Sequence, residues 1–485
     1  MKKLMMFFMV LLGVTGLITG CSNNEESNAQ GENSDETVEL KWYLIGTPQP
    51  DTEKVMEEVN EYTKEKINAT IDLNLIDWGD YDERMQVITA SAEEYDIAFT
   101  SSWANNYSLN ARKGAFLELN DLLDEHGKEM KEAINPQFIE GAKIDGSLYA
   151  IPTNKELGQQ AVLSFNNELV EKHNLDVSDV NSIEDLEPLL EVIKQNEPDV
   201  TPIATFDAYL PFDFILQGEM PFAFRLDGNT DEVVNVYEED VTMDTLKTMH
   251  DYYQKGYIRS DAATSTDSWP LEVANWFVRK ELYQPYAEKV WSRSAGYEIV
   301  AQPLHEPYIF NGSVTGSMQA ISATSQNPEK AMEFLNLLNT DPYLRNLLDK
   351  GIEGEHYEEV EDGKIKDLPA RVEKFNMPSF AIGNQLILKL YEDDPEDKWE
   401  AFEEFNDKSI PSPALGFYFD TNPVRTEIAA ISNVTSEYAP ALLKGAVDPE
   451  EYLPKFNDKL YEAGLQKVLD EIQKQYDEWK KQHGE

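Results

Sequence analysis

The sequence predicts an α/β fold with a parallel sheet, and three observations support this prediction. Between residues 38 and 99, short apolar segments of strand periodicity alternate with amphipathic helical segments in the order β-α-β-α-β. The composition is 41% hydrophobic and 11% aromatic, which is typical of a globular chain. The 485 residues exceed the size of one ordinary domain, so we expect two lobes.

The start of the chain predicts export. Two lysines precede an apolar run over residues 4–18, and small residues precede Cys21, the only cysteine. This pattern indicates a signal peptide over residues 1–20, too short for a permanent membrane span. Ile-Thr-Gly-Cys at 18–21 resembles a bacterial lipobox, which implies that Cys21 is lipidated and becomes the new N-terminus. An ordinary secreted protein with one stray cysteine is the alternative.

Residues 21–37 hold no large apolar side chain. Such a segment cannot bury enough surface to offset the entropy of ordering, so we expect a disordered tether. Beyond it, no segment approaches the roughly 18 consecutive apolar residues of a membrane span. The folded body is therefore predicted to lie on the extracellular face of the membrane, held by the lipid.

The charge narrows the choice of ligand. The formal charge is −50, and it becomes −52 when Lys2 and Lys3 leave with the signal peptide. This excludes nucleic acid, whose binding requires clustered Lys and Arg. It also disfavours anionic ligands, unless Arg225, Arg293 or Arg425 forms a local basic pocket for a uronic acid.

The elements of the first predicted sheet follow from their apolar periodicity. Val38, Leu40, Trp42 and Leu44 alternate along a strand, and a helix capped by Asp51 follows. The remaining elements are a strand over 71–75, a helix over 81–92 and a strand over 96–99. Short strands joined by helices of this length give parallel pairs with right-handed crossovers.

Ligands gather at the carboxyl ends of strands in such a sheet. The segments there are 46–50, 77–80 and 101–106, all polar loops. The second carries Trp78 and the third carries Trp103. Each tryptophan either contacts a ligand or closes the end of the sheet.

Later segments carry equally plain signals. We expect a turn and strand over 143–152, a strand over 202–204, a helix over 246–255, a hairpin turning at 227–229, helices opening at 327–328 and 448–449, and a final helix over 460–479. The acidic spacing around the hairpin turn does not fit a calcium loop.

Motifs for catalysis are missing from the sequence. With 91 Asp and Glu residues, carboxylate pairs carry no information about acid–base chemistry, and the six His show no metal-ligand spacing. No nucleophile elbow, phosphate loop or dinucleotide fingerprint occurs. We therefore predict no enzyme activity, no metal and no cofactor.

Aromatic residues beside polar ones are the strongest functional signal. They cluster at 206–214, at 284–286 with Trp291, and at 417–420. Sugars present apolar C–H faces and hydroxyl edges, so a sugar site needs flat rings beside polar groups. Packing in a core is the alternative for each cluster alone, and together they favour an aromatic-lined cleft.

Several motifs resemble one family of transport receptors. Residues 95–100, 146–152 and 320–331, together with the lipobox, are similar to extracellular solute-binding proteins of carbohydrate ABC importers, of the maltose-binding type. The tail over 417–430 and 443–449, with 463–465 and 471–475, resembles a Gram-positive lipoprotein subgroup of that family.

The resemblance implies a periplasmic-binding-protein type II fold, with two α/β lobes joined by a hinge. The N-terminal lobe would comprise 38–151 plus 312–350, and the C-terminal lobe 152–311 plus 351–485, with a family-specific tail over 400–485. The chain would cross near Ile151, Asn311 and Lys350. Closure of the lobes on the ligand would then be read by ABC permease subunits in the membrane.

The resemblance also implies a set of ligand-binding residues. Alignment to the maltose-binding pattern gives Trp103, Asn105, Asn154, Tyr209, Tyr286 and Arg425, and the loops and aromatic clusters add Trp78, Trp291, Phe419 and Asp420. Thr421-Asn422 replaces the late aromatic pair of maltose binders, and Asn105-Asn106 replaces an acidic pair. These departures leave the sugar open and point away from maltose.

The sequence-based hypothesis is a monomeric, lipid-anchored receptor that binds a neutral oligosaccharide between its lobes and delivers it to an ABC permease. One alternative is a surface-anchored glycoside-active enzyme. Another is a receptor for a peptide or signal molecule that regulates rather than imports.

Overall fold

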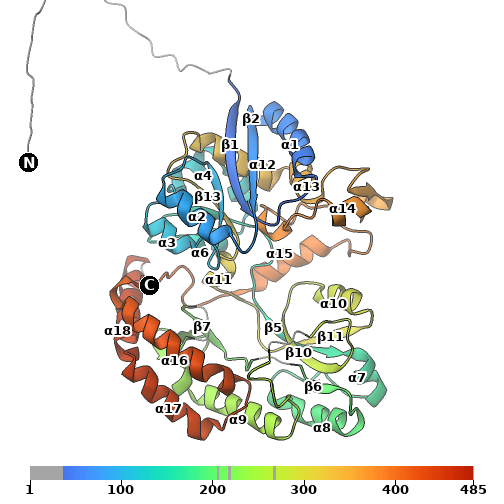
Figure 1. The fold of residues 1–485 in the computed structure, drawn as a ribbon, viewed down its shortest axis with the longest axis vertical. Coiled ribbons are helices and arrows are strands. Elements are labelled where there is room, and N and C mark those ends of the chain that lie inside the picture. Colours follow the sequence, from blue (N-terminus) through green and yellow to red (C-terminus); the bar gives the residue numbers. More distant parts are fainter. Residues whose placement is uncertain (1–35, 205–206, 217–219, 266–268, 484–485) are drawn as a thin grey trace, which may run out of the picture. The chain divides into compact units, whose positions relative to one another are not determined.

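The computed structural model describes residues 36–204, 207–216, 220–265 and 269–483, with elements labelled as in Figure 1. From Thr37 onward the chain forms one compact unit. The predicted signal peptide, Cys21 and the tether as far as residue 35 lie outside the described residues, so these remain predictions.

The first sheet has five strands in the order β2-β1-β3-β13-β4. β1 pairs in parallel with β2 and β3, whereas β13 is antiparallel to β3 and β4. Trp42 in β1 lies opposite Leu73 on one side and Ile97 on the other. The predicted parallel β-α-β-α-β order is therefore confirmed. The strands are β1 (Val38–Ile45), β2 (Ala69–Ile76), β3 (Ile97–Thr100), β4 (Ala150–Pro152) and β13 (Met318–Ile321).

Helices pack on this sheet and enclose the first hydrophobic core (Figure 1). α1 contacts β2 and α12 contacts β1. The helix predicted after Asp51 is present as α1, and its apolar residues at i, i+1 and i+4, which are Val55, Met56 and Val59, are buried against the core. The helices are α1 (Thr52–Ile67), α2 (Tyr81–Ala90), α3 (Tyr107–Arg112), α4 (Asn120–His126), α5 (Lys128–Ala133), α6 (Pro136–Ala142), α12 (Pro328–Thr340) and α13 (Pro342–Lys350).

Two further sheets surround a second core. One has the order β11-β5-β10-β6, and the other is the antiparallel set β7-β8-β9, which contains the predicted hairpin. The strands are β5 (Ala161–Asn166), β6 (Thr201–Ile203), β7 (Phe212–Phe214), β8 (Phe222–Arg225), β9 (Val233–Asn235), β10 (Trp276–Leu282) and β11 (Ile299–Pro303). The helices are α7 (Asn167–His173), α8 (Glu187–Asn196), α9 (Asp240–Gln254) and α10 (Ala287–Ala295).

Three C-terminal helices complete the second core: α16 (Arg425–Leu443), α17 (Pro449–Glu462) and α18 (Leu465–His483). The predicted start at Asp448-Pro449 is confirmed, because the Asp448 side chain accepts a hydrogen bond from the Glu450 N–H. The predicted final helix over 460–479 begins too early. Gly464 has φ +100°, a left-handed conformation that ends α17 before α18 begins.

Short elements join or extend the two cores. They are α11 (Asn311–Val314), α14 (Pro369–Glu373), α15 (Lys398–Lys408), and the strand pairs β12 (Tyr308–Ile309) with β16 (Ile410–Pro411) and β14 (Tyr357–Glu359) with β15 (Ile365–Asp367).

The chain passes between the two cores in three places. β4 lies in the first sheet and β5 in the second, which agrees with a crossing after Ile151. The chain returns through α11, at the predicted Asn311. The third crossing differs from the prediction near Lys350, because Phe375, Met377 and Ile382 still pack in the first core. The chain leaves the first core only after Ile382, because residues 351–382 carry apolar side chains that complete it.

Candidate functional site

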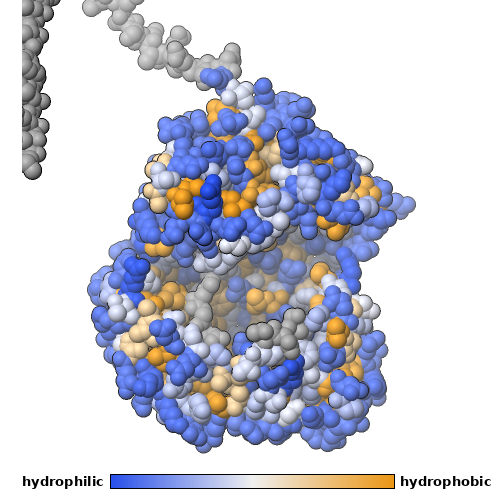
Figure 2. All heavy atoms as spheres, in the orientation of Figure 1, coloured by the Kyte–Doolittle hydropathy of each residue, from blue (hydrophilic) through white to orange (hydrophobic). Residues whose placement is uncertain are grey.

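A cavity of about 300 Å³ takes its walls from both cores and from a crossing segment. The loop after β3 contributes Ser102 and Asn106, and β7 contributes Asp213 and Phe214. Figure 2 shows a recess across this face of the described body, with apolar side chains exposed inside it. We call this space the interlobe cavity. Its other walls are Tyr107, Ser108, Ile215, Leu216, Asn311, Gly312, Thr315, Ala414, Phe417, Tyr418 and Phe419.

A second cavity of about 430 Å³ adjoins the first and is mostly apolar. Phe214 and Leu216 line both cavities, so the two lie side by side. Inside it, the ring of Tyr209 stacks on the imidazole of His305, with centroids 4.9 Å apart and planes 8° apart. Burial lowers the pKa of His305, so this stack is uncharged at neutral pH. We call this space the aromatic cavity.

Three aromatic rings form an exposed platform beside the interlobe cavity. Trp78 lies 6.3 Å from Trp103 and 6.0 Å from Phe380, centroid to centroid, in stacked geometry. Both tryptophans stay more than 40% exposed, although large aromatic side chains are usually covered. Trp103 directly follows Ser102, a wall of the interlobe cavity, although none of the three rings is itself a wall of that cavity.

The platform is fixed by hydrogen bonds to β13 and to the two residues just before it. The Trp103 indole N–H donates to the Gly316 carbonyl at 2.8 Å. The Ser317 hydroxyl donates to the Phe380 carbonyl at 2.7 Å, and the Gln319 amide donates to the next carbonyl, that of Ala381, at 2.7 Å. These bonds pre-organise the rings, which reduces the entropy lost when a ligand stacks on them.

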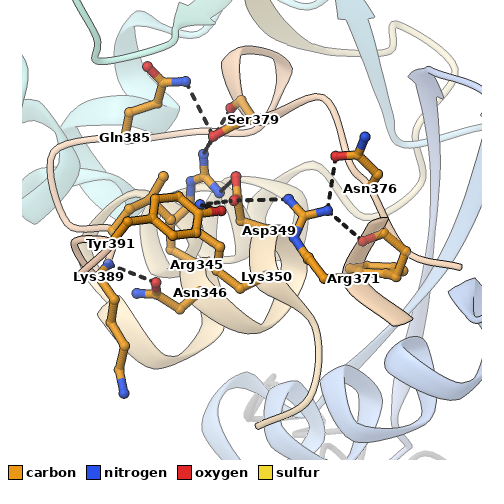
Figure 3. Close-up of polar contacts among 12 residues, drawn as sticks. Arg345, Asn346, Asp349, Lys350, Arg371, Asn376, Ser379, Gln385, Lys389 and Tyr391 are labelled. Atoms are coloured by element: carbon orange, nitrogen blue, oxygen red, sulfur yellow. Dashed lines mark hydrogen bonds and ion pairs between the residues drawn. The ribbon is translucent and has the colours of Figure 1, made fainter. Parts of the chain in front are cut away.

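A buried ionic cluster anchors the segment that carries Phe380 (Figure 3). Arg345 in α13 is fully buried, and its guanidinium donates to Asp349 Oδ2 and to the Ser379 carbonyl, both at 2.9 Å. Lys350 Nζ lies 3.0 Å from Asp349 Oδ1. Burial opposes ionisation of Asp349, but the charges of Lys350 and Arg345 outweigh it and hold its pKa well below the usual range.

Asn311 ties the second crossing to the C-terminal region. Its side-chain amide donates to the carbonyls of Ala414 and Phe417 at 2.8 and 2.7 Å, and its Oδ1 accepts from the Gly416 N–H at 2.7 Å. One side chain therefore fixes the loop at 414–417, which forms one wall of the interlobe cavity.

Four of the residues predicted from the sequence lie at this site. Trp78 and Trp103 belong to the platform, Tyr209 lines the aromatic cavity and Phe419 lines the interlobe cavity. The structure thus brings together residues from two predicted loops and two predicted aromatic clusters, and their contact with a ligand remains a prediction.

Two predicted residues are engaged in the scaffold. Asn105 is 6% exposed, donates to the Phe99 carbonyl at 2.9 Å and accepts from Asn110 at 2.8 Å. Asn154 is 4% exposed, and its amide donates to the Ala133 carbonyl at 3.1 Å. These bonds shape the loop after β3 and the first crossing.

The other four predicted residues lie outside both cavities. The Tyr286 hydroxyl donates to Asp397 at 2.7 Å, just before α15, and Trp291 packs beside a small cluster around Trp276. Asp420 accepts hydrogen bonds from the backbone and side chain of Asn422. Arg425 is exposed at the start of α16.

Sequence reasoning missed three residues that the structure places at the site: Phe380, Asp213 and Asn311. Phe380 comes from a segment with no periodic signal. Asp213 lies within the aromatic cluster at 206–214. An acidic residue between two apolar residues of a strand was the signal that could have identified it. Asn311 was recognised only as a crossing point.

One group in the described chain combines the side chains of a metal site: Asp51, Glu355 and His356. Each of these three side chains already contacts another polar side chain or backbone group of the protein. His356 Nδ1 accepts from the Ile352 N–H at 2.9 Å, so Nε2 carries the proton and faces Asp51 at 3.3 Å. Lys54 bonds to Glu355. This geometry also explains why Asp51 precedes α1 without the predicted capping bond.

Comparison with known proteins identifies the family. Residues 46–344 match the family model of bacterial extracellular solute-binding proteins, and residues 413–481 match a domain of unknown function, DUF3502. A carbohydrate ABC transporter substrate-binding protein of Streptococcus pneumoniae serotype 4 is 36% identical, covering 96% of this chain and 95% of the relative. The chain belongs to the bacterial extracellular solute-binding proteins.

Solved structures of this family agree with the fold. The N-glycan transport solute binding protein (NgtS) of Streptococcus pneumoniae is 37% identical, with a TM-score of 0.85 over 92% of this chain and 99% of that chain. A solute-binding protein of Bifidobacterium longum infantis is 16% identical with a TM-score of 0.64, which supports the fold alone. The predicted family and two-lobed α/β class are confirmed.

Membership in this family also decides between two classes of function. Solute-binding proteins of ABC transporters are not enzymes, so the glycoside-active alternative is set aside. Among the described residues, no helix combines the length and apolarity needed to cross a bilayer.

Proposed function

We propose that this solute-binding protein is the receptor for an oligosaccharide, held between its lobes against the aromatic platform. The observation that carries the proposal is the pairing of two stacked tryptophans with a hollow lined by both cores. Sugar rings stack on indole faces through their C–H groups, and the polar walls can bond to hydroxyls. The 36% identical relative is named as a carbohydrate ABC transporter substrate-binding protein.

The relative's solved complexes suggest the kind of sugar. Structures of NgtS are named in complex with Man1GlcNAc and with Man5GlcNAc. A neutral glycan of this type suits two adjoining cavities with apolar and polar walls. We therefore propose a neutral oligosaccharide as the ligand.

Closure of the lobes is the proposed means of signalling to the permease. This chain matches the NgtS structure named without a glycan at a TM-score of 0.85, and the two named complexes at 0.74 and 0.70, at the same identity. Because the sequence is the same, the scores differ through conformation. This supports a rearrangement of the lobes on ligand binding, which a membrane permease would recognise.

The remaining parts of the proposal rest on the sequence. Cys21 would carry the lipid, residues 21–37 would form the tether, and the receptor would act as a monomer on the outer face of a Gram-positive membrane. A Cys21→Ala variant should be released into the medium with unchanged glycan affinity. Retention of that variant in the membrane fraction would contradict lipid anchoring.

Calorimetric titration tests the binding claim. Man5GlcNAc, Man1GlcNAc, a malto-oligosaccharide series and a peptide mixture would each be added to the purified mature chain. We expect saturable binding of a neutral glycan and none of the peptides. Binding of peptides alone would contradict the proposal and favour a peptide receptor.

A further inference from the structure

Asp213 is a buried carboxyl group at the wall of the interlobe cavity. It lies in β7 between Phe212 and Phe214 and opposite Phe224 of β8, and it is 4% exposed. Its Oδ2 has no hydrogen-bond partner among the described residues. Burial of a carboxylate oxygen that has no hydrogen-bond partner disfavours the folded state, so this oxygen calls for an explanation.

No cation compensates this carboxyl, because no Lys, Arg or His is among the described walls of the cavity. The tyrosines there, Tyr107 and Tyr418, donate their hydroxyls to the carbonyls of Ala142 and Gly141.

The neighbouring elements carry cations that are already engaged elsewhere. In β8, Arg225 forms two hydrogen bonds to Glu239, at 2.8 and 2.7 Å. In α3, Arg112 donates to the Tyr418 carbonyl at 2.6 Å. In the adjoining aromatic cavity, Lys280 donates to the Asp207 carbonyl at 2.6 Å, and His305 stacks on Tyr209.

We propose that Asp213 binds the ligand directly, accepting a hydrogen bond from a hydroxyl of a neutral sugar in the interlobe cavity, and that it excludes acidic sugars from this position. The inference rests on the proposed function and adds a specificity to it. A hydrogen bond from a hydroxyl to an ionised acceptor is stronger than a hydrogen bond between two neutral groups. A carboxylate of the ligand at the same place would meet a like charge without a counterion.

The proposal predicts a proton linkage near neutral pH. Burial raises the pKa of Asp213 to about 6, and the adjacent Ser412 hydroxyl and Ala414 backbone offset it only in part. A sugar hydroxyl that donates to the carboxylate stabilises the ionised form and lowers this pKa. Ligand binding near pH 6 should therefore release a proton, and affinity should rise between pH 5 and pH 7.5.

The experiment compares Man5GlcNAc binding by the wild-type chain, Asp213→Asn and Asp458→Asn, an exposed control on α17. Calorimetry at pH 5 and 7.5, in two buffers of different ionisation enthalpy, measures affinity and proton release. We expect about tenfold tighter wild-type binding at pH 7.5 than at pH 5, with proton release at pH 6. Asp213→Asn should bind about tenfold more weakly at pH 7.5, without pH dependence, and should melt at a higher temperature.

Two results separate the inference from the proposed function. If the wild-type chain binds no glycan, the proposed function fails. If it binds a neutral glycan without proton release near pH 6, or if Asp213→Asn binds like Asp458→Asn, the role of Asp213 is overturned while the receptor function stands. The proton measurement needs no variant, so poor folding of Asp213→Asn would leave the test intact.

The proposed exclusion of acidic sugars has its own test. If the wild-type chain binds a uronate-bearing glycan as tightly as the neutral glycan, that exclusion is overturned.

Discussion

Asp349 and Asp213 are both buried aspartates, and they differ in what surrounds them. Asp349 has Arg345 within hydrogen-bonding distance and Lys350 at 3.0 Å, which hold its pKa below the usual range. Asp213 has no charged partner, and burial raises its pKa to about 6. The first carboxylate stabilises the fold that positions Phe380, whereas the second destabilises the folded chain at neutral pH and belongs to a residue that lines a cavity. Both side chains are buried, so burial alone does not distinguish a structural carboxylate from a candidate binding carboxylate. The presence or absence of cationic partners does.

The largest expected effect comes from neutralising Asp349. Asp349→Asn leaves Arg345 and Lys350 buried without their counterion, so we expect the free energy of unfolding to fall by about 3–5 kcal/mol. Urea denaturation at pH 7 measures the change. A loss below 1 kcal/mol would show that the cluster does not hold this part of the first lobe together.

Asp213→Asn should change stability in the opposite direction. The pKa of Asp213 in the folded chain is raised from 3.8 to about 6, so the folded state holds this proton more tightly than the unfolded state. The protonated Asp213 carboxyl therefore stabilises the fold fully below pH 4, and this stabilisation is lost as pH rises through 6. The variant should therefore be more stable than wild type at pH 7 by about 2–3 kcal/mol, and equal to it at pH 4. Equal stability at pH 7 would contradict the raised pKa of Asp213.

Trp103→Ala tests the platform that the Asp349 cluster supports. Loss of the stacking face should weaken glycan binding by about 1–2 kcal/mol, or roughly five- to thirtyfold, with little change in stability because the ring is exposed. Tyr343→Ala, an exposed tyrosine outside both cavities, is the matched control. Equal affinities of the two variants would remove the platform from the site.

The smallest effect is expected at Arg425. Its side chain is exposed at the start of α16 and lines neither cavity, so Arg425→Ala should alter glycan affinity by less than about 0.5 kcal/mol. Titration with the same glycan checks this. A tenfold loss would restore the alignment-based prediction that Arg425 contacts the ligand.

Local sequence patterns predicted the elements better than they predicted the site. Alternating Leu40, Trp42 and Leu44 and the stripe of α1 identify β1 and α1, because periodicity records which face is buried. The third crossing could not be found this way, since residues 351–382 join the first core through long-range contacts such as that of Phe375.

The candidate site shows the same limit. Trp78 and Trp103 were predictable because both follow strands of a parallel sheet, where ligand loops converge. Phe380 was not, because its segment is held at the platform by bonds from Ser317 to Phe380 and from Gln319 to Ala381, which join residues distant in sequence. Loop position and alignment indicated Asn105, and alignment indicated Arg425, but neither records whether a polar atom is already bonded within the protein.

A crystal structure of the mature chain with bound Man5GlcNAc would show whether the platform and Asp213 hold the glycan. We expect a sugar ring stacked on the Trp78 and Trp103 platform and a glycan hydroxyl within hydrogen-bonding distance of the Asp213 carboxylate. A glycan bound outside the two cavities, with the platform and Asp213 uncontacted, would contradict it.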